Sequence, residues 1–119
     1  MALPQLDSER LTLRAWDPDK PADVVAAFDI YRRDEVSRWL GAHPAPWTSE
    51  QAAHARLLRW QSAGFDAPGY GVWAVVPAAH RDPVGSVLLG HLPDAEGTQT
   101  DDIEIGWHLH PDHWGQGYA

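Results

Sequence analysis

The stretch EIGWHLHPDHWGQGYA, residues 104–119, contains the two local patterns that restrict fold and function most strongly. Apolar and polar residues alternate through its first half, which predicts an extended strand. Gly115 and Gly117 follow, and glycine permits a tight turn and a close approach of the main chain to a ligand. At the start of a helix, such a turn is a natural anion site, because unpaired N–H groups and the helix dipole favour negative charge. Two glycines fit a plain tight turn equally well, so the surrounding sequence is needed to choose between the two.

The composition limits the class of protein. A chain of 119 residues has room for one domain, and 44% hydrophobic residues are enough to form its core. With 17 acidic and 9 basic residues the net charge is −8, which argues against nucleic acid as a partner, because that binding depends on neutralising phosphates. The absence of cysteine excludes disulfides, thiolate metal sites and a cysteine nucleophile. The sequence shows neither a signal peptide nor an apolar run long enough to span a membrane, so we expect a soluble, cytoplasmic protein.

The first half of the chain predicts one strand followed by three helices. Alternating residues indicate the strand, and apolar residues at helical spacing indicate the helices. Asp17 or Asp19 is expected to cap the first helix, and the sequence Thr-Ser-Glu-Gln at 48–51 is typical of the start of the third. Gly41 and Gly64 are expected to end the second and third helices. The predicted elements are a strand at residues 11–16 and helices at residues 22–33, 35–40 and about 50–64.

The second half of the chain changes to an extended pattern. After a turn at 67–69, three strands are predicted at residues 70–76, 84–92 and 102–109, separated by loops rich in proline and aspartate. We find no internal repeat. A strand, then helices, then three consecutive strands indicate an α+β domain with a mostly antiparallel sheet and flanking helices.

These motifs, taken in order, resemble the GNAT acetyltransferases. Residues 103–119 closely resemble the acetyl-CoA-binding motif of that superfamily, and they look most like the branch of ribosomal-protein N-terminal acetyltransferases of RimJ/RimL type. Residues 8–14 and 83–87 resemble the first and third strands of that branch. The Gln or Arg that opens the pyrophosphate loop in the superfamily is Trp114 here. Family members continue beyond this loop, so the resemblance implies that residues 1–119 form a single, incomplete GNAT-like domain, the N-terminal portion only.

The resemblance also implies an activity. A GNAT enzyme transfers the acetyl group of acetyl-CoA to a primary amine by direct attack, without a covalent enzyme intermediate and without a metal. The acceptor would be a protein N-terminus or a small amine, and the sequence does not choose between them. An alternative is a non-catalytic remnant that binds acyl-CoA or dimerises. We expect the 119-residue chain alone to be inactive, and we expect the edge of the strand at 102–109 to pair with another chain and form a homo-oligomer.

By the same resemblance, particular residues receive roles. Glu104 would contact the acceptor amine or help to remove its proton, since the amine must be neutral when it attacks. Strand alternation, however, places Glu104 and Trp107 on opposite faces unless a bulge intervenes. Trp39 and Trp47 flank an irregular segment and would shape the acceptor pocket. Acetyl-CoA would be bound through the main chain of Trp107, His108 and Leu109 along the pantetheine arm, and by Trp114, Gly115, Gln116, Gly117, Tyr118 and Ala119 around the pyrophosphate.

The histidines, a serine and the tryptophans in periodic elements allow other interpretations. His108, His110 and His113 suggest a metal site, but their spacing is loose and the glycine motif explains the segment without one. A serine hydrolase is disfavoured because residues 85–87 lack the nucleophile-elbow pattern. Trp16, Trp60, Trp73 and Trp107 lie in periodic elements and are expected to be packing residues.

Overall fold

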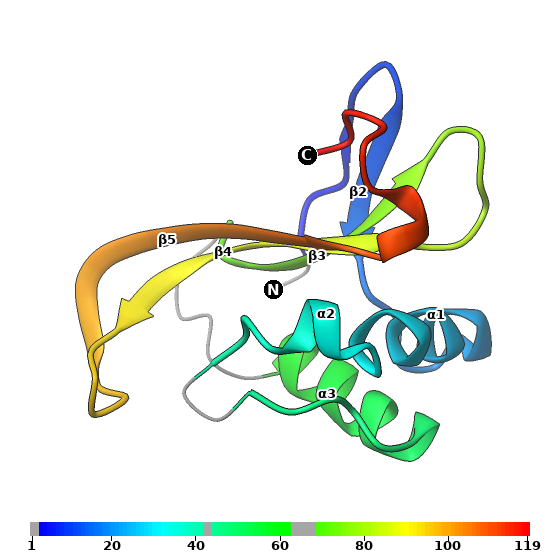
Figure 1. The fold of residues 1–119 in the computed structure, drawn as a ribbon. Helices are drawn as coiled ribbons and strands as arrows, with labels where there is room; N and C mark the ends of the chain where they lie inside the picture. Colours follow the sequence, from blue (N-terminus) through cyan, green and yellow to red (C-terminus); the bar gives the residue numbers. More distant parts are fainter. Residues whose placement is uncertain (1–2, 42–43, 63–68) are drawn as a thin grey trace.

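The structure, a computed structural model, describes residues 3–41, 44–62 and 69–119 (Figure 1). A short hairpin and three helices precede three long strands and a final 3-10 turn. The elements are β1 (Leu6–Asp7), β2 (Leu11–Ala15), α1 (Pro21–Tyr31), α2 (Asp34–Ser37), α3 (Glu50–Ser62), β3 (Gly71–Pro77), β4 (Gly85–Pro93), β5 (Gln99–Leu109) and η1 (Pro111–His113).

The strands form one sheet in the order β1-β2-β3-β4-β5, and every neighbouring pair is antiparallel. The predicted α+β fold with a mostly antiparallel sheet is therefore confirmed. Among the described residues β5 is an edge strand, because β4 is its only partner in the sheet. The ladder between β4 and β5 is regular from Gly85 to His91, and its register shifts only between His91 and Pro93.

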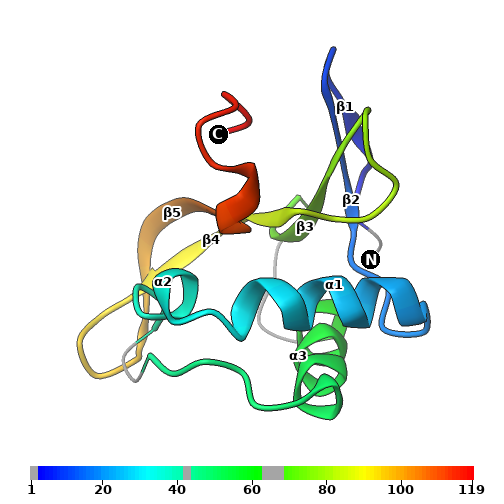
Figure 2. The same cartoon turned by 45° about the vertical axis from the view of Figure 1, so that its right-hand side comes forward.

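All three helices pack on the same face of the sheet, as Figures 1 and 2 show from two directions. The core lies between the helices and this face. It contains Trp16, Ala27, Ile30, Tyr31, Val36, Leu57, Val72 and Ala74. Strand alternation puts Ser86 and His108 on the helix-covered face, because they pair with each other and Ser86 pairs with Ala74.

The opposite face of β5 is apolar and exposed. Ile103, Ile105 and Trp107 are 50%, 65% and 55% exposed. Trp107, expected to be a core or half-buried packing residue, lies outside the core, because its strand position points it away from the helices. The expectation for Trp16 and Trp73 is confirmed, since they are 3% and 5% exposed. Association through β5 stays a prediction.

Several predicted boundaries need correction. Neither Asp17 nor Asp19 caps α1. The N-cap residue is Lys20, whose side chain has no acceptor and makes no capping bond. The carboxylate of Asp17 accepts the N–H of Asp19 instead. The hydroxyl of Ser49 accepts the N–H of Ala52 at 3.0 Å, which confirms the predicted start of α3. Strand β1 was not predicted, since two residues carry no periodicity. The predicted helix end at Gly64 and the turn residues 67–68 lie outside the described residues.

One buried ion pair ties the sheet to α1. The guanidinium of Arg14 donates to both carboxylate oxygens of Asp23, at 2.7 and 2.8 Å, and the Asp17 N–H donates to the same carboxylate at 2.9 Å. Asp23 is fully buried. The hydrogen bonds that Arg14 donates to Asp23 raise the pKa of Arg14, so this cation keeps its charge despite partial burial. The pair fixes the position of α1 on the sheet.

Among the described residues, no helix combines the length and the apolar character that crossing a bilayer requires.

Candidate active site

The open edge of β5 presents main-chain groups in a fixed pattern. The N–H of His110 donates to the carbonyl of Val84 at 2.7 Å, so the main chain of His110 faces β4. Main-chain groups alternate in direction along an antiparallel strand, and His108 therefore also faces β4, while Trp107 and Leu109 face the open edge. His108 can reach a ligand at this edge only through its imidazole. The main-chain role expected for His108 does not fit this register.

A cleft of about 490 Å³ runs along this edge, between α2 and the glycine loop at residues 114–119. Helix α2 and the turn after it contribute Glu35, Val36 and Trp39. The cleft brings together eight of the nine residues that were expected to bind acetyl-CoA. These are Trp107, His108, Leu109, Trp114, Gly115, Gly117, Tyr118 and Ala119, and Gln116 is the ninth.

The glycine loop owes its shape to positive backbone dihedrals. Gly115 and Gly117 have φ of 73° and 77°, a region that residues with a Cβ rarely adopt. The indole N–H of Trp114 donates to the carbonyl of Leu109 at 2.7 Å and anchors the loop to the strand edge. Trp114 therefore has a structural use at the position where the superfamily places Gln or Arg.

Arg10 holds the loop from the other side. Its guanidinium donates to the carbonyl of Gln116 at 2.6 Å and lies 4.8 Å from the centre of the Tyr118 ring. An added Cβ on Gly117 would lie 3.4 Å from the guanidinium of Arg10. A cation beside a glycine loop suits an anionic ligand such as a diphosphate, because both the charge and the main-chain N–H groups of such a loop attract anions.

The imidazole of His108 is held by a buried network. The hydroxyl of Tyr31 lies 3.0 Å from Nδ1 of His108 and 2.8 Å from the hydroxyl of Ser86, which accepts the indole N–H of Trp16 at 3.0 Å. Tyr31 and Ser86 are fully buried. Burial lowers the pKa of His108 and raises that of Tyr31 far above its ordinary value, so both side chains are neutral near pH 7.

Glu104 lies on the same face of β5 as His108, opposite Gly90 on β4. Between residues 103 and 109 the ladder has no bulge, so Glu104 and Trp107 do point to opposite faces. Glu104 is half-buried and is absent from the lining of the cleft. Its catalytic role stays a prediction.

The two tryptophans expected at the acceptor pocket have different surroundings. Trp39 is 79% exposed and lines the cleft. Trp47 is half-buried and stacks on Tyr31, with ring centres 4.6 Å apart and planes inclined by 27°. Trp47 therefore packs against the ring of Tyr31 and does not line the cleft. Trp39 does line it and can contact a ligand there.

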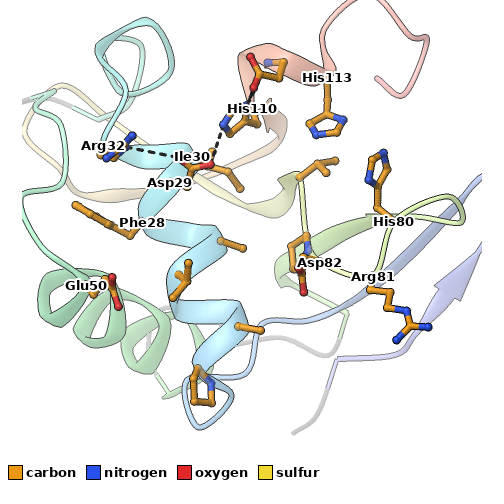
Figure 3. Close-up of a pocket in the computed structure, with 17 residues that line it drawn as sticks. Phe28, Asp29, Ile30, Arg32, Glu50, His80, Arg81, Asp82, His110 and His113 are labelled. Carbon is orange, nitrogen blue, oxygen red and sulfur yellow. Dashed lines mark hydrogen bonds and ion pairs between the residues drawn. The ribbon is translucent and has the colours of Figure 1, made fainter.

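Three histidines gather in a second cleft, between α1 and the loop before β4 (Figure 3). The rings of His80 and His113 meet edge to face, with their centres 4.8 Å apart. Nε2 of His110 lies 2.9 Å from a carboxylate oxygen of Asp29. Burial, together with the charges of His80 and His110, lowers the pKa of His113. Within residues 3–41, 44–62 and 69–119, no group of three potential ligands is arranged to hold a metal ion.

The fold and the cleft define a class of protein, and comparison with known proteins identifies it. The sequence model of the acetyltransferase (GNAT) domain matches residues 10–119. The chain belongs to the GNAT acetyltransferase family. The RimJ/RimL branch is not distinguished by this match.

Individual relatives agree with this assignment. FsC-acetyl coenzyme A-N(2)-transacetylase of Aspergillus fumigatus is 34% identical over 79 residues, which are 62% of this chain and 32% of that protein. A GNAT-family acetyltransferase from Bacillus anthracis has a TM-score of 0.66 at 19% identity, over 97% of this chain and 58% of its own. A putative GNAT-family acetyltransferase from Bordetella pertussis has a TM-score of 0.65 at 20% identity, over 96% and 63%. The chain thus spans about a third of the first relative and about three fifths of the solved structures.

Three residues with a part in this site were not predicted from the sequence. Ser86 lies inside an apolar strand, where a hydroxyl is a signal for a buried hydrogen bond. Tyr31 fits the apolar face of a helix, and helical spacing does not mark its hydroxyl as part of a site. Arg10 reaches the loop across 106 positions of sequence, and no local pattern reports such a contact.

Proposed function

We propose that the protein is an acetyl-CoA-dependent N-acetyltransferase that acts on a primary amine, either a protein N-terminus or a small amine. The observation that carries this proposal is the cleft at the β5 edge, which gathers the glycine loop, an open strand edge and exposed aromatic rings. Membership of the GNAT family and the name of the Aspergillus relative, an acetyl coenzyme A transacetylase, support acetyl-CoA as the co-substrate.

Each part of the cleft suits one part of acetyl-CoA. The glycine loop and Arg10 offer main-chain N–H groups and a positive charge to the pyrophosphate. The outward main-chain groups of Trp107 and the outward N–H of Leu109 suit the amide groups of pantetheine, which would add to the sheet as an extended strand does. The carbonyl of Leu109 already accepts the indole N–H of Trp114. The exposed ring of Trp39 lies on the helix side of the cleft and offers an apolar contact.

The proposed reaction is the transfer of an acetyl group from a thioester to an amine. The neutral amine nitrogen forms a bond to the thioester carbonyl carbon, and the bond from that carbon to sulfur breaks, giving an amide and the thiol of CoA. The proton that the amine loses balances the proton that the sulfur gains. Glu104, on the same face of β5 as His108, is proposed to accept the amine proton directly or through water.

The proposal is tested with the full-length protein, meaning the longest form that its gene encodes. Release of the CoA thiol from acetyl-CoA is followed with a panel of amines that includes peptides with free N-termini, polyamines and antibiotic amines. We expect thiol release that depends on one class of amine and a product acetylated on nitrogen. A trapped acetyl-enzyme, or activity lost only with a chelator, contradicts direct attack.

A second candidate is an acyl-CoA-binding protein without transferase activity. The position of Glu104 outside the cleft lining favours it. Acetyl-CoA binding without thiol release for any amine in the panel would establish this second function. We also propose a cytoplasmic location, supported by a chain without cysteine.

A further inference from the structure

We propose that the His108 imidazole is a catalytic hydrogen-bond donor whose Nε2–H binds the carbonyl oxygen of the acetyl thioester, with Tyr31 and Ser86 as the residues that position it. This inference rests on the proposed function, because it needs acetyl-CoA in the cleft. It gives the thioester carbonyl a side-chain partner, which the contacts proposed above do not supply. The observations that carry it are the buried network behind His108 and the place of its ring in the cleft.

The direction of each hydrogen bond in the network follows from the groups available. The Trp16 indole can only donate, so the Ser86 oxygen accepts from it. The hydroxyl oxygens of Ser86 and Tyr31 lie 2.8 Å apart, and because both hydroxyls can rotate, this distance allows either one to donate to the other. Ser86 is fully buried, so its own hydrogen needs an acceptor, and the Tyr31 oxygen is the one that the described residues place beside it. Ser86 therefore donates to Tyr31. The Tyr31 hydroxyl hydrogen is then free to donate to Nδ1 of His108, at 3.0 Å.

The opposite direction is disfavoured. If Nδ1 of His108 donated to Tyr31 and Tyr31 donated to Ser86, the Ser86 oxygen would accept twice, and its own hydrogen would have no acceptor within the described part of the chain. A buried hydroxyl hydrogen without an acceptor is costly. The network thus selects the neutral imidazole with its proton on Nε2.

The Nε2–H group is left for the cleft. In the part of the chain that the structure describes, Tyr31 is the hydrogen-bond partner of His108, and it contacts Nδ1. The imidazole lines the cleft beside Trp107 and Leu109, whose main chains face the same open edge. An N–H group held in a fixed position at the wall of a cleft is the kind of donor that stabilises negative charge as it develops on a carbonyl oxygen.

The same network makes His108 a donor and not a proton shuttle. To pass its Nε2 proton to another group, His108 would have to take the hydroxyl proton of Tyr31 at Nδ1. Burial raises the pKa of Tyr31 far above its ordinary value, so a phenolate at this position is strongly disfavoured. The imidazole therefore holds its proton throughout the transfer.

The tautomer is tested without any ligand, by NMR of the full-length protein with histidine labelled by nitrogen-15. We expect the His108 signals of a neutral ring with a bare Nδ1 and a protonated Nε2 at pH 7, assigned by their loss in His108→Gln. Tyr31→Phe removes the donor to Nδ1 and should give a mixture of the two tautomers. A charged ring, or a proton on Nδ1 in the wild type, overturns the proposal.

The contact with substrate is tested by infrared spectroscopy of bound acetyl-CoA carrying carbon-13 at the thioester carbonyl. We expect the carbonyl stretch to lie at lower frequency in the protein than in solution, and His108→Leu to reverse most of that change. His91→Leu on β4 is the matched control, because His91 lies outside the cleft lining and should leave the stretch unchanged. An equal shift in His108→Leu and the wild type assigns the carbonyl contact to the main chain and overturns the proposal.

Kinetics separate this inference from the proposed function. Loss of one preorganised donor lowers kcat by about 10²–10³-fold, so His108→Leu should lower kcat by that order with little change in KM for acetyl-CoA. His108→Gln keeps a side-chain N–H and should recover part of the rate. If acetyl-CoA does not bind the wild type, the proposed function and this contact both fail. If it binds and reacts but kcat is unchanged in His108→Leu, the contact alone fails.

Discussion

Gly117→Val is expected to weaken acetyl-CoA binding while leaving the fold intact. Gly117 has φ of 77°, and its added Cβ would lie 3.4 Å from the guanidinium of Arg10. For a residue with a Cβ this left-handed backbone conformation costs about 1–2 kcal/mol of free energy, and for a β-branched residue it costs more. The loop of the variant relaxes in the free protein and must regain the strained shape to cradle the pyrophosphate. The binding energy lost is therefore at least about 1.4 kcal/mol, a tenfold rise in Kd.

Titration calorimetry with acetyl-CoA measures this change, and Gly97→Val is the matched control. Gly97 has φ of 84° with open space around its Cβ position, but it lies in the turn between β4 and β5, outside the cleft lining. Gly97→Val should carry a similar backbone strain and leave Kd unchanged. A folded Gly117→Val protein with wild-type Kd would refute the placement of the pyrophosphate at this loop.

Three further outcomes are expected. Asp23→Ala removes the carboxylate that pairs with Arg14 and should lower the free energy of unfolding, measured in urea, by about 3–5 kcal/mol. Asp34→Ala is the control. It breaks an exposed pair and should lower the free energy of unfolding by less than about 1 kcal/mol. Trp114→Phe removes the N–H that anchors the loop to Leu109, so Kd for acetyl-CoA should rise about 2–10-fold by calorimetry, and an unchanged Kd would remove Trp114 from the account. Burial lowers the pKa of His108, so below about pH 6.5 the unfolded chain binds its proton more readily than the folded one. The free energy of unfolding should then fall as the pH drops from 8 to 5.5, less steeply in His108→Leu, and equal slopes would contradict this.

Local pattern was sufficient for most of the fold. The extended patterns at residues 11–16, 70–76, 84–92 and 102–109 correspond to β2, β3, β4 and β5. Burial alternates along β5, whereas β3 is buried along almost its whole length. The hydroxyl at Ser49 was enough to fix the start of α3. Alternation alone does not tell which face of β5 the helices cover. Trp107 lies on the uncovered face, where it is 55% exposed.

The site divides in the same way. The glycine loop was recognisable because φ near +75° is a local requirement that glycine meets at Gly115 and Gly117. The Arg10 contact and the Tyr31–Ser86–His108 network depend on which segments the folded sheet and α1 bring together, and no short window of sequence contains them. The residues of this network are therefore visible only in the folded structure.

The most direct test of the central claim is amine-dependent release of the CoA thiol by the full-length protein. The account predicts that acetyl-CoA is turned over with at least one class of primary amine, that the acetyl group is found on the amine nitrogen, and that Gly117→Val raises the KM for acetyl-CoA. A folded protein that releases no thiol with any amine, or releases it at the same rate without an amine, would contradict an acetyltransferase.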